Sequence, residues 1–136
     1  MIKGLNHITI SVSSLEKSIL FYQHIFNAQL IMRGENTAYF SLNGIWLALN
    51  EERLIERNLP NTYTHLAFTV EEADIQVLEK ILTEYGAEIE IGRKRASEEK
   101  SSLYFRDPDG HLFEFHTGNL DDRLQFYRKN PNMTFY

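Results

Sequence analysis

The sequence contains no cysteine among its 136 residues. This absence excludes disulfide bonds, cysteine-ligated zinc, iron–sulfur clusters and a cysteine nucleophile together. A long apolar run is missing as well, so we expect no signal peptide, no membrane-spanning segment and a cytoplasmic protein. Excess positive charge is also lacking, because 14 Lys and Arg residues stand against 19 Asp and Glu residues. The net charge of −5 argues against nucleic acid as the main partner.

What is present is an ordinary globular composition. Hydrophobic residues make up 43% of the chain and aromatic residues 12%, which is enough to build a real core. A chain of this length is expected to form one domain.

An internal repeat organises the sequence. Residues 6–12 and 64–70 share a pattern in which a polar residue and a histidine precede apolar and small residues ending in Ser/Thr-Val. Both segments are predicted to be mostly buried strands, with His7 and His65 in equivalent positions. Matched histidines in matched strands indicate a duplication.

The elements that follow each strand repeat too. A helix is predicted from a Ser13 or Ser14 cap through Phe26, and its counterpart runs from near Glu71 to a Gly86 cap. Short strands are expected near residues 29–32 and 88–91, and each is followed by a hairpin, the second of which turns at 107–110. The predicted fold class is therefore α+β, with two paired βαβββ modules. The expected division is a single domain, 1–136, comprising module one at 1–52, a linker at 53–61, module two at 62–120, and a helix and tail at 121–136.

Superposing the two modules predicts a metal site. His7 matches His65, and Glu114 matches Ala48, so three of four symmetric positions carry ligand side chains. A single histidine on an apolar strand is more often a hydrogen-bonded core residue, but Glu114 between Phe113 and Phe115 is a charge that needs a partner. Two imidazoles and one carboxylate suit Mn²⁺, Fe²⁺, Co²⁺, Ni²⁺ or Zn²⁺ and leave coordination positions open for substrate.

These residues resemble the vicinal oxygen chelate superfamily, and within it the FosB-type fosfomycin-resistance metallothiol transferases. The resemblance covers nearly the whole chain. It is carried by the segments 4–7, 38–40, 44–52, 63–65, 92–93, 104–111, 114–118, 122–124 and 133–136.

The resemblance implies a metal held by His7, His65 and Glu114, with Mn²⁺ the usual ion and Mg²⁺ an occasional one, while Zn²⁺, Ni²⁺ or Co²⁺ can occupy the site. It also implies a homodimer in which His7 of one chain completes the site of the other. The substrates would be fosfomycin, an epoxide that bears a phosphonate, and a thiol, which is bacillithiol in this branch. Glu114 would act as the anionic ligand and the metal as the Lewis acid.

The resemblance further implies a set of substrate-binding residues. Arg93, Tyr104 and Arg123 would hold the phosphonate, which suits two guanidinium groups. The remaining members of the set would line the pocket: Thr9, Tyr39, Trp46, Asn50 and Tyr63. We expect His24, His111 and His116 to be structural or surface residues.

Two departures from the family pattern concern the thiol. Position 9 is threonine, where many bacillithiol enzymes carry cysteine and the glutathione-using branch carries threonine. The stretch 94–100 also differs from the usual loop near the thiol entrance. The thiol donor is therefore open between bacillithiol, cysteine and glutathione.

Other functions on the same scaffold are alternatives. Epoxide hydrolases of this family carry a carboxylate base, which is not evident around Asn43-Gly44. Glyoxalase-type isomerases fill all four metal positions, whereas position 48 is alanine here, and extradiol dioxygenases have longer chains. Drug-sequestering relatives lack the two histidines and the glutamate.

Overall fold

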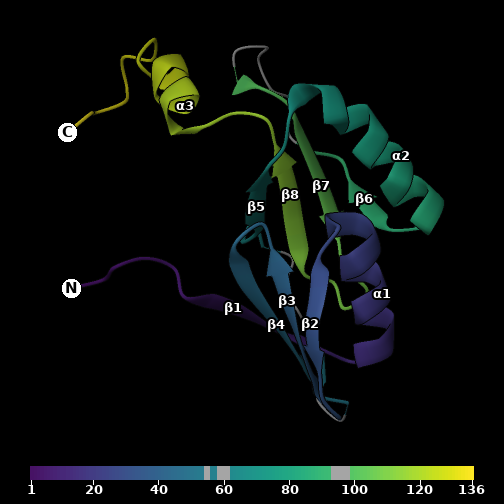
Figure 1. The fold of residues 1–136 in the computed structure, drawn as a ribbon. Helices are drawn as coiled ribbons and strands as arrows, with labels where there is room; N and C mark the ends of the chain where they lie inside the picture. Colours follow the sequence, from purple (N-terminus) through teal and green to yellow (C-terminus); the bar gives the residue numbers. More distant parts are fainter. Residues whose placement is uncertain (54–55, 58–61, 93–98) are drawn as a thin grey trace. The chain divides into compact units, whose positions relative to one another are not determined.

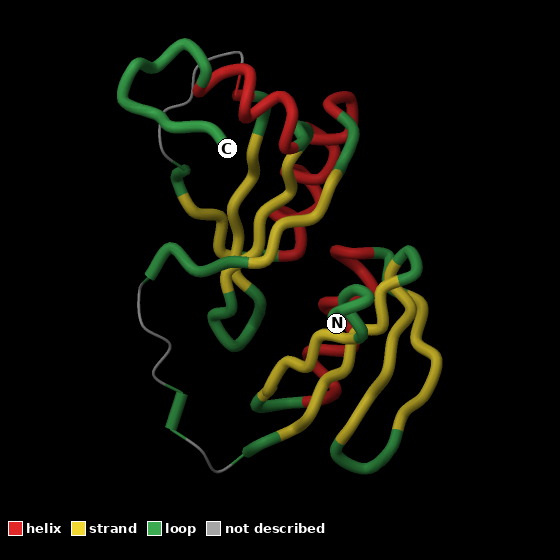
Figure 2. Tube along the Cα trace, turned by 90° about the vertical axis from the view of Figure 1, so that its left-hand side faces the viewer, coloured by secondary structure: helices red, strands yellow, loops and turns green. Residues whose placement is uncertain are grey.

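The computed structural model describes residues 1–53, 56–57, 62–92 and 99–136. The chain divides into two compact units, residues 1–61 with 107–110, and residues 62–106 with 111–136. In each unit a helix lies along one face of a four-stranded sheet (Figures 1 and 2). In the described chain no helix is both long and apolar enough to cross a membrane.

The first unit has the predicted order of elements. These are β1 (His7–Val12), α1 (Leu15–Phe26), β2 (Gln29–Arg33), β3 (Thr37–Leu42) and β4 (Ile45–Glu51). The sheet order is β1-β4-β3-β2, with β1 parallel to β4 and the other pairs antiparallel. Figure 2 shows these strands side by side.

The second unit repeats this arrangement. Its elements are β5 (Leu66–Thr69), a 3-10 turn η1 (Glu72–Asp74), α2 (Ile75–Tyr85), β6 (Glu88–Glu90), β7 (Ser102–Arg106), β8 (Leu112–His116) and α3 (Leu120–Tyr127). The sheet order β5-β8-β7-β6 has the same topology as the first, again with one parallel pair. The predicted α+β class and the duplication are confirmed.

The strand register makes the duplication exact at the candidate site. Ala48 lies opposite Thr9 on β1 and Tyr39 on β3. The register of the second sheet places Glu114 in the same way, opposite Ala67 and Tyr104. The matching of Ala48 with Glu114 that the sequence predicted is therefore the one the two sheets have.

The first helix forms where the sequence provides its caps. The hydroxyl of Ser14 accepts the Lys17 amide at 3.4 Å, and a carboxylate oxygen of Glu51 accepts the Leu15 amide at 2.5 Å. The Leu15 hydrogen bond holds the pKa of Glu51 below its usual value, with Arg53 acting in the same direction. The helix ends at Asn27, whose φ is 50°. Capping by side chains satisfies amides that have no partner inside the helix.

Apolar side chains on one face of each sheet form the core with its helix. In the first unit α1 buries Leu15, Ile19 and Tyr22 against the side of the sheet that carries Phe40 and Leu49. Burying one large apolar side chain stabilises a fold by roughly 1.5–3 kcal/mol. The opposite face of this sheet holds His7, Thr9 and Trp46, which are exposed.

The second predicted strand is shorter and more exposed than expected. β5 begins at Leu66, so His65 lies just before it, and Leu66 and Ala67 are exposed. Among the described residues β5 is an edge strand, which pairs with β8 on one side. The alternation of residue types could not distinguish an edge strand from a central one.

The turn 107–110 contributes to the first unit. The Tyr22 hydroxyl donates to Asp107 at 2.8 Å, and the Ser13 amide donates to both Asp109 oxygens at 3.0 Å. Arg57 adds an ion pair, with its Nε 3.3 Å from Asp109. This turn is thus held by hydrogen bonds to α1 and the residues before it.

The Tyr22–Asp107 hydrogen bond predicts an alkaline limb in the stability of the protein. Burial raises the pKa of Tyr22 well above 10.0, and the negative charge of Asp107 acts in the same direction. The stability that depends on neutral Tyr22 is therefore complete below pH 10 and falls, by up to about 1.4 kcal/mol per pH unit, as the unfolded tyrosine ionises. Tyr22→Phe should flatten this limb in urea unfolding between pH 9 and 11. Equal slopes for both proteins would contradict the assignment.

Candidate metal and substrate site

Glu114 is the most unusual side chain of the second unit. It lies in the middle of β8, is only 5% exposed, and points to the sheet face opposite Phe113 and Phe115. Its Oε2 lies 2.9 Å from Nε2 of His65. A carboxylate this buried requires a cationic or hydrogen-bonding partner, and His65 is one.

The second nitrogen of His65 identifies which atom is available as a ligand. Nδ1 lies 2.6 Å from the carbonyl oxygen of Tyr63, which can only accept, so Nδ1 carries the hydrogen. Nε2 is therefore the nitrogen that faces Glu114, and it is the atom of His65 placed to bind a metal. A backbone carbonyl on the distal nitrogen is the usual arrangement for a metal-ligating histidine.

The spacing of these two donor atoms fits a divalent cation. Nitrogen and oxygen ligands lie about 2.0–2.2 Å from such an ion, so two ligands at right angles are about 3 Å apart. The observed 2.9 Å between Nε2 of His65 and Oε2 of Glu114 matches this spacing. In the part of the chain that the structure describes, no three His, Cys, Asp or Glu side chains form a complete metal site. The second unit by itself therefore offers two ligands.

Aromatic hydroxyl groups surround His65. The hydroxyls of Tyr63 and Tyr104 are 2.7 Å apart, and both rings meet the imidazole edge to face, with centroids 4.9 and 5.5 Å away. Tyr104 is buried, whereas Tyr63 is 62% exposed. The pair therefore presents two phenol groups beside the predicted ligand.

Gly92 lies against the ring of Tyr104. A Cβ at this position would be 3.1 Å from Cδ2 and 3.3 Å from Cε2 of Tyr104, closer than side chains normally pack. The segment after β6 therefore passes the Tyr104 ring only because residue 92 has no side chain. The predicted phosphonate ligand Arg93 lies outside the described residues.

His116 is closer to the site than the sequence analysis expected. Its Nδ1 lies 2.8 Å from the Ser102 hydroxyl, 3.0 Å from the Ser101 carbonyl and 3.6 Å from Oε1 of Glu114. Strand alternation places residues 114 and 116 on one face, which is the signal for this proximity. His116 is hydrogen-bonded within the second unit, and it also forms part of the surroundings of Glu114.

Arg123 is paired with an acidic residue that the sequence did not single out. Nη1 of Arg123 lies 2.9 Å from Oε1 of Glu99, which is only 4% exposed. Arg123 is on α3, which begins after Asn119 with a reciprocal capping box between Asn119 and Asp122. The helix α3 and the ion pair with Glu99 therefore fix the position of this guanidinium group.

The first unit carries the remaining predicted residues on one sheet face. His7 lies on β1 beside Trp46 on β4, with ring centroids 4.6 Å apart. The ring of Tyr39, on β3, meets the ring of Trp46 edge to face, with their centroids 5.2 Å apart. Thr9 follows on the same face of β1, and the side-chain oxygen of Asn50 accepts from Thr37 at 3.0 Å.

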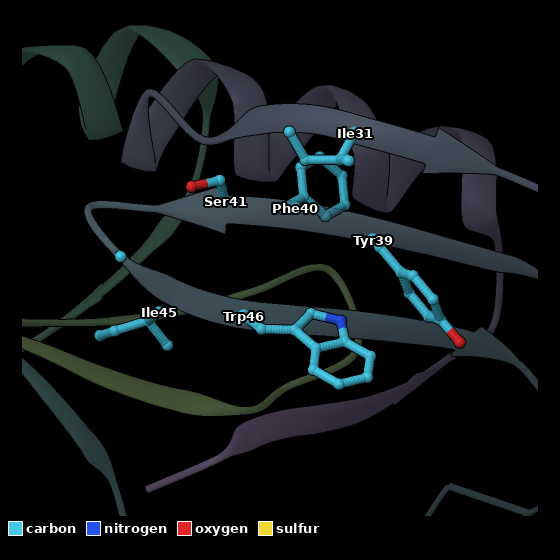
Figure 3. Close-up of a pocket in the computed structure, with 7 residues that line it drawn as sticks. Ile31, Tyr39, Phe40, Ser41, Ile45 and Trp46 are labelled. Atoms are coloured by element: carbon cyan, nitrogen blue, oxygen red, sulfur yellow. The ribbon is translucent and has the colours of Figure 1, made fainter.

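Next to this face is a cavity of about 310 Å³. Figure 3 shows the rings of Tyr39 and Trp46 on neighbouring strands at its edge. The cavity is lined mainly by apolar groups, from Ile31, Tyr39, Phe40, Ser41, Gly44, Ile45 and Trp46. Two predicted substrate residues, Tyr39 and Trp46, therefore line an open surface depression in this unit.

Comparison with known proteins agrees with this geometry. Residues 4–115 match the family described as the glyoxalase/bleomycin resistance protein/dioxygenase superfamily. The chain is 50% identical to a metallothiol transferase FosB of Staphylococcus epidermidis, covering 100% of this chain and 99% of the relative. It is 47% identical to a metallothiol transferase FosB of Bacillus licheniformis, covering 99% of this chain and 89% of the relative.

A solved structure shows the same fold with a ligand. The fosfomycin resistance protein FosX of Listeria monocytogenes, a mutant complexed with Mn(II) and 1S,2S-dihydroxypropylphosphonic acid, is 37% identical with a TM-score of 0.85, covering 93% of this chain and 99% of that one. The chain therefore belongs to the glyoxalase/bleomycin resistance protein/dioxygenase superfamily and, within it, to the FosB metallothiol transferases.

Proposed function

We propose that the protein is a transferase that inactivates fosfomycin by adding a low-molecular-weight thiol to its epoxide. The observation that carries this proposal is the buried Glu114 carboxylate 2.9 Å from a histidine whose other nitrogen is anchored to a backbone carbonyl. The FosB relatives, 44–50% identical over nearly the whole chain, support the same reaction.

The metal ligands of this proposal are His7, His65 and Glu114. A divalent cation agrees with the Mn(II) in the related FosX structure, and we propose Mn²⁺ as the resident ion, with Mg²⁺ as a substitute. When bound, the ion supplies Lewis-acid stabilisation of the negative charge that develops on the epoxide oxygen.

The protein's own side chains position the drug. The hydroxyl of Tyr104 donates to the phosphonate, and Arg123 and Arg93 contribute charge-assisted hydrogen bonds. A second group lines the pocket around the oxirane: Thr9, Tyr39, Trp46, Asn50 and Tyr63. The sulfur of the thiol then forms a bond to the less hindered ring carbon as that carbon's bond to oxygen breaks. The thiol's proton passes to solvent, and the released alkoxide oxygen takes up a proton from solvent to become a hydroxyl group.

The nucleophile must come from outside the chain, because the chain has no cysteine. We propose bacillithiol as the donor. Because position 9 is threonine, cysteine and glutathione are the alternative donors to test. Loss of free thiol, followed colorimetrically with each of the three, should depend on both fosfomycin and Mn²⁺ and should be fastest with bacillithiol. Equal consumption without fosfomycin in every tube would contradict transfer. If the thiol were consumed fastest with glutathione, glutathione rather than bacillithiol would be the donor.

We further propose a homodimer in which His7 of one chain completes the site built on His65 and Glu114 of the other. The second unit's two ligands and the open sheet face that carries His7 support this proposal. Mixing His7→Ala and Glu114→Ala proteins after unfolding and refolding should then restore about one quarter of the wild-type activity. Half of the dimers are mixed, and one of their two sites is intact. Mixtures as inactive as either variant alone would place the site within one chain.

Hydration of the epoxide is the second candidate, because a FosX structure has been solved with 1S,2S-dihydroxypropylphosphonic acid, a diol. The hairpin between β3 and β4 argues against it. Its turn is Asn43-Gly44, with φ values of 47° and 84°, the left-handed pair typical of a tight hairpin. A carboxylate residue at position 44 would be strained at this φ, so this turn is not built to hold a general base.

A further inference from the structure

The two histidines of the site are held in matching ways by different groups. Nδ1 of His65 donates to the backbone carbonyl of Tyr63 at 2.6 Å. Nδ1 of His7 lies 2.7 Å from Oδ1 of Asn6, a side-chain oxygen that can only accept. In both modules Nδ1 therefore donates its hydrogen to a protein oxygen, and Nε2 is the nitrogen left to bind a metal.

His7 depends on this contact more than His65 does. It stands at the first residue of β1 and is exposed, whereas His65 is half-buried between Tyr63 and Tyr104. The ring of Trp46 contacts one side of the His7 ring, with the two centroids 4.6 Å apart and the ring planes tilted by 39°. An exposed imidazole samples several rotamers and both tautomers unless a hydrogen bond selects one.

We propose that Asn6 is a positioning residue, which fixes the tautomer and ring orientation of His7 so that Nε2 is ready to bind the metal. This inference rests on the proposed function, since it assumes that His7 is a metal ligand. Asn6 does not touch the substrate or the reacting atoms; it acts through His7 alone. Such outer groups typically change metal affinity 10- to 100-fold when removed, which is on the order of the effect expected here.

The test measures Mn²⁺ binding to the purified full-length protein by the room-temperature electron paramagnetic resonance signal of the free ion. Asn6→Ala should raise the dissociation constant about 10- to 100-fold. Asn6→Asp keeps the acceptor oxygen and should restore it to within about threefold of the wild type. Asn36→Ala, an exposed amide in the turn before β3, is the matched control and should leave the constant unchanged.

Two further readouts separate positioning from other roles. The melting temperature of Asn6→Ala should match that of Asn36→Ala, because the contact is exposed. At saturating Mn²⁺ the KM for fosfomycin should also be unchanged, which a substrate contact would not allow. Mn²⁺ binding to Asn6→Ala as tight as to the wild type would overturn the inference, as would failure of Asn6→Asp to restore it. Absence of Mn²⁺ binding by the wild-type protein would instead overturn the metal site of the proposed function.

Discussion

Glu114→Gln is expected to lose at least about 100-fold in fosfomycin-modifying activity, because removing a ligand costs more than removing its outer partner. Glutamine has nearly the volume of glutamate, so the packing of β8 should survive. Its amide can donate to Nε2 of His65 and so replace the 2.9 Å contact of the carboxylate. The glutamine lacks the negative charge that binds a cation. The measurement is initial rate against Mn²⁺ concentration, together with Mn²⁺ binding.

Glu90→Gln is the matched control for this variant. Glu90 lies on β6 of the same sheet and is paired with Arg106, so the change removes one carboxylate from an ion pair of the same unit. It should leave Mn²⁺ affinity unchanged. Wild-type turnover by Glu114→Gln would show that Glu114 is not a metal ligand.

Arg123→Ala is expected to raise the KM for fosfomycin about 10- to 150-fold, the range for losing a charged hydrogen bond of 1.5–3 kcal/mol. Mn²⁺ affinity should stay the same. The guanidinium is held at 2.9 Å by Glu99, so its position is set before the drug arrives. Pre-organised donors bind an anion without the cost of ordering them on binding.

The pairing with Glu99 also complicates the single variant. Removing Arg123 leaves a 4% exposed carboxylate without this partner, which costs stability. The double variant Arg123→Ala/Glu99→Gln removes that charge and should keep the high KM while regaining stability. If Glu99→Gln alone raised KM as much as Arg123→Ala, the effect would belong to the ion pair rather than to a contact with the drug.

The sequence predicted the parts of the molecule that depend on local pattern and on the repeat. The paired βαβββ modules followed from matched histidines, helix caps and hairpin turns, and the registers of both sheets agree with the matching of Ala48 with Glu114. The proximity of His65 to Glu114 follows from the same reasoning, because parallel neighbouring strands bring these positions together.

Contacts between residues distant in sequence were beyond local pattern. Tyr22 and Asp107 are 85 residues apart, and nothing near either one signals the buried hydrogen bond between them. Glu99 lies in the stretch 94–100, which was noted only for its difference from the family loop, yet it is buried beside Arg123. Asn6 precedes the first strand and was noted only as part of the repeat and of a family motif; its role depends on a side-chain geometry that spacing does not reveal.

The most direct test of the central claim is the mass of the product formed from fosfomycin in ¹⁸O-labelled water with Mn²⁺ and bacillithiol. Thiol transfer predicts one product, whose mass is the sum of drug and thiol and which carries no ¹⁸O. A dihydroxypropylphosphonate containing one ¹⁸O, formed equally well without thiol, would contradict transfer and show that the protein hydrates the epoxide.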